Sequence, residues 1–171
     1  MIQENLYTPD CIRTVTGKYV NVFDPKPDMF VIEDIAHALS MQTRFGGHLP
    51  YFYSVAQHST NCYYLIENKD HAFAALMHDA SEAYLLDIPR PIKQRLSNYK
   101  DIEHNVMLCL SEVFGFQYPL SKEVKEIDEQ LLQIEWDSLM LRKNSAIEIK
   151  SQYEAKENFL IAYKNCKSTT P

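Results

Sequence analysis

The feature that most constrains the fold of this 171-residue chain is an apolar run that leads directly into a dense polar cluster. The run, residues 72–77, contains Ala, Phe, Leu and Met without Gly or Pro, and this composition predicts a buried helix. The cluster, residues 78–93, holds one histidine, three carboxylates and two basic side chains. Because ionised carboxylates are costly to bury unless they are paired or bound to a metal, the fold must supply partners for them.

We expect the apolar run and the first half of the cluster to form one helix, from about His71 to Leu86, that ends before Pro89. In such a helix Glu82 lies one turn after the His78-Asp79 pair, on the same surface. An imidazole beside a carboxylate, with a second carboxylate one turn away, is typical of a metal site with its proton-transfer group.

The spacing of apolar residues elsewhere predicts a predominantly α-helical chain. A β-prone alternation around a glycine predicts one short hairpin between Thr14 and Phe23, and two prolines in residues 24–28 predict a turn after it. We expect Ser54 and Ser121 each to begin a helix, because serine is favoured at helix N-termini. The expected helices cover residues 31–41, 54–67, 91–96, 99–114, a long segment from 121, and 151–167.

Composition narrows the class of protein. The length fits one domain, and 46% hydrophobic and 23% charged residues are ordinary for a globular protein with a substantial core. The formal net charge of -6 argues against a surface for a nucleic-acid polymer, although basic groups inside a pocket could still bind a small anion. Four scattered cysteines, no leader-like N-terminus and no apolar run near the roughly 20 residues of a membrane span favour a reduced, cytoplasmic protein without membrane contact.

Three inward-facing polar positions fall on separate expected helices: His58, the His78-Asp79 pair and Asp128. Each alone has a plain structural explanation, since a buried histidine is usually a hydrogen-bonded core residue, and Asp128 could pair with a basic side chain or cap a helix. Together, two imidazoles and two carboxylates suit a divalent transition metal. Asp137 is the rival to Asp128, but it lies nine residues later on nearly the opposite face.

The order of these residues resembles the HD-domain superfamily of metal-dependent phosphohydrolases, whose pattern is a His, a later His-Asp pair and a distant Asp. A narrower resemblance, over roughly residues 32–139, is to the 5′-deoxynucleotidase branch and looks most like its small prophage-associated members. It rests on an Arg-aromatic pair before the first His, on a Glu three residues after the His-Asp pair, and on the pattern Asp-x-Pro-x-Pro-x-Lys that follows. These residues are Arg44, Phe45, Glu82, Asp87, Pro89, Pro91 and Lys93.

The resemblance implies an all-α HD-domain helical bundle with a small N-terminal β-hairpin, a single domain over residues 1–171 with its core at about 31–140. It implies one divalent transition metal (Mn, Co, Ni, Zn or Fe) and a metal-dependent phosphomonoesterase of the 5′-nucleotidase type, active in nucleotide metabolism on (deoxy)ribonucleoside 5′-monophosphates. Members of the family form dimers, so the resemblance also allows a homodimer. The implied metal ligands are His58, His78, Asp79 and Asp128.

The remaining site residues take roles from the same resemblance. Asp79 is catalytic as well as a ligand, and Glu82 would handle the proton of the attacking water or of the leaving alkoxide. Arg44 could hold the phosphate with its planar fork, and Asp87 would face the sugar near its 2′ position. His48 could touch phosphate or only hydrogen-bond its loop, and Lys93 could add positive charge or lie on the surface.

Two other functions remain open from the sequence. The same metal chemistry could act on nucleoside triphosphates or cyclic dinucleotides in a differently shaped pocket. Alternatively, the pocket could serve a non-enzymatic nucleotide-binding sensor. The presence of Glu82 weighs against the sensor, because a pure binding module has no use for a proton-transfer carboxylate.

Overall fold

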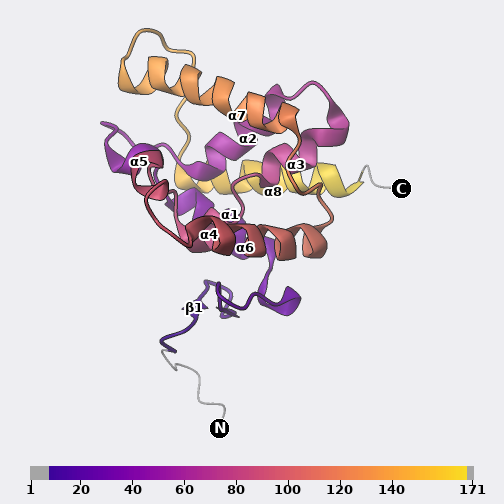
Figure 1. Ribbon diagram of the computed structural model, residues 1–171. Helices are drawn as coiled ribbons and strands as arrows, with labels where there is room; N and C mark the ends of the chain where they lie inside the picture. Colours follow the sequence, from indigo (N-terminus) through magenta and orange to yellow (C-terminus); the bar gives the residue numbers. More distant parts are fainter. Residues whose placement is uncertain (1–7, 169–171) are drawn as a thin grey trace.

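The computed structural model describes residues 8–168, which form a body of packed helices with one small β-hairpin (Figure 1). The all-α fold class expected from the sequence is confirmed at this level. The principal helices are α1 Ile32–Met41, α2 Val55–Leu65, α3 Ala72–Met77, α4 Glu82–Leu85, α5 Arg90–Lys93, α6 Tyr99–Phe114, α7 Lys122–Glu135 and α8 Gln152–Ser168. Short 3-10 turns cover Pro27–Met29, Arg44–Gly47 and Lys69–His71, and one π turn, Trp136–Met140, continues α7.

The hairpin lies beyond one side of the helical body in Figure 1, and its two strands are only two residues long. Strand β1, Ile12–Arg13, pairs antiparallel with β2, Tyr19–Val20, so that Ile12 lies opposite Val20. The expected hairpin is therefore present, with its first strand two residues earlier than predicted. Asp34 of α1 anchors it by accepting hydrogen bonds from the backbone N–H and hydroxyl of Thr16, at 2.9 and 2.7 Å.

Helix boundaries agree with the sequence prediction where a local capping residue defines them. The hydroxyl of Ser54 accepts a hydrogen bond from the Gln57 N–H at 3.1 Å and begins α2. Ser121 caps α7 in the same way through Val124 N–H. Gly115 ends α6 in the left-handed conformation, with φ 76°, which glycine adopts without a steric penalty.

The expected single helix from His71 to Leu86 is wrong. Helix α3 ends at Met77, residues 78–81 form a tighter turn, and α4 begins at Glu82. In this turn the N–H of Ala80 bonds to Met77 O and the N–H of Glu82 bonds to Asp79 O, which are three-residue rather than four-residue spacings. Because the turn advances by three residues rather than by about 3.6, Glu82 takes a different direction relative to α3 from the one it would have in a continuous α-helix.

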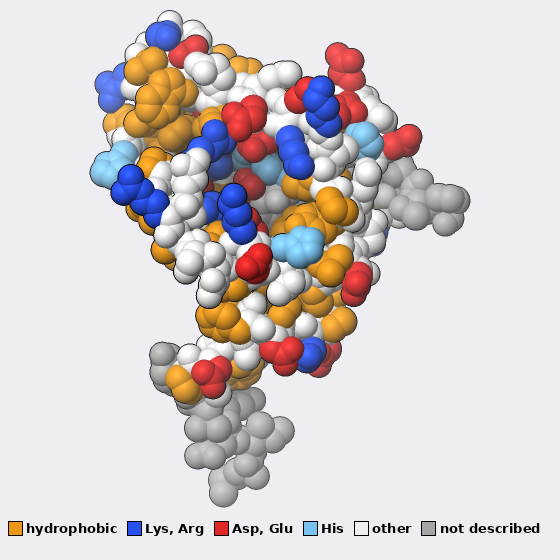
Figure 2. Space-filling model, viewed as in Figure 1, with side chains coloured by type: hydrophobic (Ala, Val, Ile, Leu, Met, Phe, Trp, Pro, Cys, Tyr) orange, Lys and Arg blue, Asp and Glu red, His pale blue; other side chains and the backbone are white. Residues whose placement is uncertain are grey.

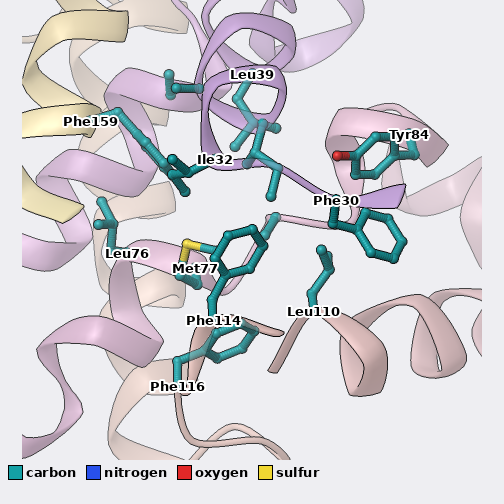
Figure 3. Close-up of a cluster of buried hydrophobic side chains, with 14 of the residues drawn as sticks. Phe30, Ile32, Leu39, Leu76, Met77, Tyr84, Leu110, Phe114, Phe116 and Phe159 are labelled. Carbon is teal, nitrogen blue, oxygen red and sulfur yellow. The ribbon is translucent and has the colours of Figure 1, made fainter. Parts of the chain in front are cut away.

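The hydrophobic core is built around α8, which crosses α1, α2 and α3. Ala155, Phe159 and Ala162 of α8 are buried. Figure 3 shows Phe159 close to Leu39 and Ile32 of α1, with Leu76 and Met77 of α3 nearby. The core therefore extends well past residue 140. Within residues 8–168, no helix combines the length and the apolar character that crossing a bilayer requires.

Candidate metal centre

Four buried or half-buried side chains bring potential metal-ligand atoms together. His58 and Cys62 come from one face of α2, His78 from the turn after α3, and Asp128 from α7. One donor atom from each lies within 4.8 Å of the others. Because these donors come from three separate parts of the chain and are largely withdrawn from solvent, the group could hold a metal ion.

The distances at this group suit a shared cation. His58 Nε2 lies 3.2 Å from His78 Nε2 and 3.1 Å from Asp128 Oδ1, and His78 Nε2 lies 3.7 Å from the same oxygen. Ligand atoms bound to one ion at about 2.1 Å are separated by about 3.0 to 3.4 Å in octahedral or tetrahedral arrangements. The spacing of the two imidazoles and the carboxylate therefore fits a metal with little rearrangement.

Asp79 and Cys62 are the two further donors at this group. Asp79 Oδ2 lies 3.1 Å from His78 Nε2 and 3.7 Å from His58 Nε2. Both carboxylates expected as ligands, Asp79 and Asp128, therefore lie beside the same pair of imidazole nitrogens. Cys62 Sγ lies 3.8 Å from His58 Nε2. Sequence reasoning did not name Cys62 as a ligand, although its position four residues after His58 places both on one helix face.

The two imidazoles are held so that their Nε2 atoms are free to bind a cation. His78 Nδ1 donates a hydrogen bond to Ala75 O at 2.8 Å, and a carbonyl oxygen can only accept. His58 Nδ1 faces Glu135 Oε1 at 2.7 Å. With the proton on Nδ1 in each ring, both Nε2 atoms carry lone pairs that point into the same small space.

Glu135 is the functional residue that the sequence did not indicate. It is fully buried, and besides His58 it accepts hydrogen bonds from Tyr53 Oη at 2.6 Å and Arg44 Nη2 at 3.2 Å. Burial opposes its ionisation, but the charges of His58 and Arg44 hold the pKa of Glu135 below its usual value. Glu135 thus holds the His58 ring through Nδ1, the ring nitrogen that does not face the other ligands. Its spacing, four residues after the buried Leu131 and seven after Asp128, places it on the inward face of α7, but nothing in the residue type marked it as a partner of His58.

The carboxylates make the centre favourable for positive charge. Burial acts to raise the pKa of Asp79, but the neighbouring His78 outweighs it and brings this pKa to about 2. For His58, burial and the Arg44 charge act to lower the pKa, while Glu135, Cys62 and Asp128 raise it well above its ordinary value. The cluster therefore attracts protons or, in their place, a cation.

Glu82 lies beside the centre with one oxygen available. Its side chain is buried, and Oε2 has no hydrogen-bond partner among the described residues. Burial, together with the charges of Asp79 and Asp87, raises the pKa of Glu82 well above its ordinary value. A carboxyl with a raised pKa keeps its proton to a higher pH than an exposed carboxyl does, which suits a group that donates a proton.

Arg44 enters the site from a turn with unusual backbone geometry. Phe45 has φ 56° and ψ 30°, a left-handed conformation that bulky residues rarely adopt, and Gly46 follows with φ 59°. The N–H of Arg44 donates to Tyr53 O at 2.9 Å and holds the turn in place. The guanidinium is buried, with Nη1 3.8 Å from Asp79 Oδ2 and 3.9 Å from Asp87 Oδ2. Its Nε has no partner among residues 8–168.

Gln42, the residue that ends α1, ties together the segments around the site. Its side-chain amide donates to Glu82 O at 2.8 Å, and its side-chain oxygen accepts from the Asp87 N–H at 3.1 Å. Its backbone bonds to Ala38 O and accepts from the N–H of Val55. One residue therefore links α1, the start of α2 and both ends of the α4 segment.

A cleft of about 900 Å³ opens over the centre. Asp79, Glu82 and Asp128 line its floor, and Arg44, Asp87 and Lys93 also line it, as expected from the sequence. Figure 2 shows this hollow with acidic and basic side chains gathered around it.

Lys93 and the other residues considered from the sequence differ in their surroundings. Lys93 Nζ bonds to Glu103 at 2.5 Å and lies 3.9 Å from Glu82 Oε1. His48 is exposed at the rim. Asp137, the rival to Asp128, instead pairs with Lys143 at 3.0 Å.

Comparisons with known proteins place this chain among relatives whose names give no activity. The chain is 40% identical over 148 residues, 86% of its length and 83% of the relative's, to the uncharacterized protein YfdR of Escherichia coli K12. It is 29% identical over 140 residues, 74% of its length and 71% of the relative's, to the uncharacterized protein RCAP_rcc00048 of Rhodobacter capsulatus. No protein-family model matches the chain.

Proposed function

We infer that this chain, which belongs to the same family as the uncharacterized protein YfdR, is a metal-dependent phosphomonoesterase of the HD-domain type. We propose (deoxy)ribonucleoside 5′-monophosphates as its substrates. The observation that carries the proposal is the pair of imidazole Nε2 atoms, which lie 3.2 Å apart beside the carboxylate of Asp128, a residue that lines the cleft. An unpartnered Glu82 oxygen and a buried arginine beside that pair supply the other groups that ester hydrolysis needs.

In this proposal His58, His78, Asp79 and Asp128 hold one divalent metal. The metal supplies Lewis-acid chemistry, since it polarises a phosphoryl group and lowers the pKa of water. Mixed nitrogen and oxygen ligands suit Mn, Co, Ni, Zn or Fe. Glu135 keeps the His58 proton on Nδ1, so that Nε2 faces the centre.

The remaining residues bind the substrate and move its protons. Arg44 presents an unpaired Nε–H beside the centre and neutralises phosphate charge. Glu82 acts through Oε2, which has no partner among the described residues. In its protonated form it protonates the 5′-oxygen that leaves the phosphorus, or in its ionised form it accepts the proton of the attacking water. Asp87, half-buried opposite Arg44, accepts a hydrogen bond from a sugar hydroxyl. The products are a nucleoside and inorganic phosphate.

A hydrolysis screen tests the proposal, with inorganic phosphate measured directly and the nucleotide products separated by chromatography. The arms are deoxyribonucleoside and ribonucleoside 5′-monophosphates, nucleoside triphosphates and cyclic dinucleotides, each with Mn, Co, Ni, Zn, Fe(II) or Mg and with a chelator. We expect metal-dependent release from the monophosphates. We expect His78→Ala and Asp79→Ala to lose bound metal and turnover together, because each removes a ligand. We expect Glu82→Gln to keep its metal but lose roughly 10²- to 10⁴-fold in kcat.

Asp137→Asn is the matched control, since Asp137 pairs with Lys143 away from the cleft. Full activity and retained metal in both His78→Ala and Asp79→Ala would contradict the assignment. Hydrolysis of triphosphates or cyclic dinucleotides alone, seen as new nucleotide products, would keep the metal chemistry but replace the proposed substrate. Nucleotide binding without hydrolysis in any arm would assign the pocket to a sensor.

A further inference from the structure

The cleft has a second end that the proposed chemistry does not use. Along with the carboxylates of its floor, Phe45 and Trp136 line the same cavity. Their ring centroids lie 6.1 Å apart, with the ring planes at 51°. Figure 2 shows apolar side chains gathered over the C-terminal end of α7, beside the hollow. Neither a phosphate nor a metal is bound through aromatic rings, so the end of the cleft at Phe45 and Trp136 would contact another part of the ligand.

One face of α7 connects the two ends of the cleft. The cleft-lining residues Asp128, Leu132, Trp136 and Met140 are spaced four apart and so lie along one side of the helix and its π turn. At about 1.5 Å of rise per residue, Trp136 lies about 12 Å along the axis from Asp128. A phosphate, a sugar and a planar base in succession span a distance of this order.

The local backbone holds both aromatic rings in place. The π turn, closed by the Leu141 N–H to Trp136 O at 2.9 Å, widens the helix where the indole begins. Phe45 keeps its left-handed backbone at φ 56°, a conformation of the kind that concentrates at ligand sites. Arg44, the phosphate-facing residue, lies 5.7 Å from the Phe45 ring centroid. The anion-binding and aromatic ends are therefore joined through adjacent residues.

The chemistry of this end favours stacking over hydrogen-bond recognition. The cleft-lining residues on this part of α7 include two apolar side chains, Leu132 and Met140, and one amide, Gln133. Trp136 is 42% exposed although it is a large aromatic side chain, so a sizeable part of the residue is open to a partner. Stacking on an aromatic ring tolerates any base, because every base has a π face.

We propose that Phe45 and Trp136 form a base-binding platform on which the nucleobase of the substrate lies against the indole ring. The inference rests on the proposed function, because it takes the phosphate to lie at the metal end. The platform makes a planar base a requirement for efficient binding while leaving the identity of the base nearly free.

The single tryptophan of the chain gives a direct binding assay that needs no turnover. We add thymidine 5′-monophosphate, deoxyadenosine 5′-monophosphate, 2-deoxyribose 5-phosphate and inorganic phosphate to the metal-loaded Glu82→Gln protein. We expect both nucleotides to change the Trp136 fluorescence and to saturate, whereas the sugar phosphate and phosphate leave the emission nearly constant. The two nucleotides should bind within a few-fold of each other.

Steady-state rates provide the second readout. We expect kcat/KM for the nucleotides to exceed that for 2-deoxyribose 5-phosphate by roughly 5- to 150-fold, the contribution of stacking one base on one ring. Trp136→Ala should abolish most of this ratio, and Trp136→Phe should restore part of it. Tyr153→Ala is the matched control, because this exposed aromatic lies on α8 away from the cleft.

The outcomes separate this inference from the proposed function. Equal rates on nucleotides and 2-deoxyribose 5-phosphate, with constant Trp136 emission, would overturn the platform and leave the phosphatase intact. A saturable emission change in the Glu82→Gln protein, with no phosphate release by the metal-loaded wild-type protein, would support the platform and remove the enzymatic proposal. A change of Trp136→Ala from dimer to monomer in light scattering, with the substrate ratio retained, would assign the indole to a subunit contact and overturn the platform.

Discussion

At the scale of single residues, Glu135 organises the centre without facing the cleft. One carboxylate oxygen is shared by His58 Nδ1 and Tyr53 Oη, and the other accepts from Arg44. The same side chain thus orients a candidate metal ligand and balances the charge of the candidate phosphate-binding arginine. Removing one partner of such a buried charged network costs far more than the loss of a surface ion pair.

We predict that Glu135→Gln weakens metal binding by about 10- to 100-fold, as is typical when a group behind a ligating histidine is changed. The amide keeps a hydrogen-bond acceptor for His58 but removes the negative charge that makes the imidazole a stronger ligand. Calorimetric titration of Zn or Co into the two proteins measures the change. Glu126→Gln, an exposed position on the same helix that pairs with Lys122, serves as the control. Equal affinities in wild type and Glu135→Gln would remove this role.

At the scale of elements, the centre depends on where each helix begins. Ser54 caps α2 three residues before Gln57 and four before His58, and its side chain is fully buried. We predict that Ser54→Ala lowers the free energy of unfolding by about 1 kcal/mol, since an N-cap hydroxyl contributes that much. Urea denaturation measures the difference. Ser97→Ala, at an exposed serine outside the helices, should change it little, and equal effects of the two substitutions would argue against the cap.

Elements with a local signal were predictable from the sequence. The limits of α1, the start of α2 and the end of α6 follow from apolar spacing, Ser54 and Gly115. The interruption of the helix at residues 78–81 was missed, because these residues individually tolerate a helix and the tighter turn arises from their partners elsewhere. The same holds for Phe45, since no sequence rule places a bulky residue in the left-handed region.

The candidate site was only partly accessible from the sequence. His58, His78, Asp79 and Asp128 lie together in the structure, as their order along the chain suggested. Gln42 gave no signal, because it acts through partners far away in the sequence and a glutamine after a helix looks like a surface residue. Glu135 carried a positional signal, since it lies four residues after the buried Leu131, but its partners come from distant segments and cannot be read from the helix alone.

At the scale of the whole molecule, the candidate ligands join parts of the chain that a metal would hold together. His58 belongs to α2, His78 follows α3 and Asp128 belongs to α7. A metal that binds only the folded chain stabilises it by about 2.7 kcal/mol when its free concentration is 100 times its dissociation constant.

We therefore predict that Zn or Co raises the unfolding midpoint and that a chelator reverses the rise. Thermal denaturation with and without metal measures it, and His78→Ala should abolish the metal-dependent part. The His37→Ala protein would keep the full shift under the same conditions, since the half-buried His37 lies on α1 outside the cleft. A shift that survives in His78→Ala would place the bound metal elsewhere.

The two hydrogen bonds of the Gln42 side chain connect two points of the cleft wall. One is made to the backbone carbonyl of Glu82 and the other to the backbone N–H of Asp87, which lie at the two ends of one short segment. Under the proposed function, the carboxyl that serves the leaving oxygen and the carboxyl that meets the sugar are therefore tied to one common amide. The distance between the two carboxyls, and with it the fit of the sugar, would then depend on Gln42, a side chain for which the proposal gives no contact with the substrate.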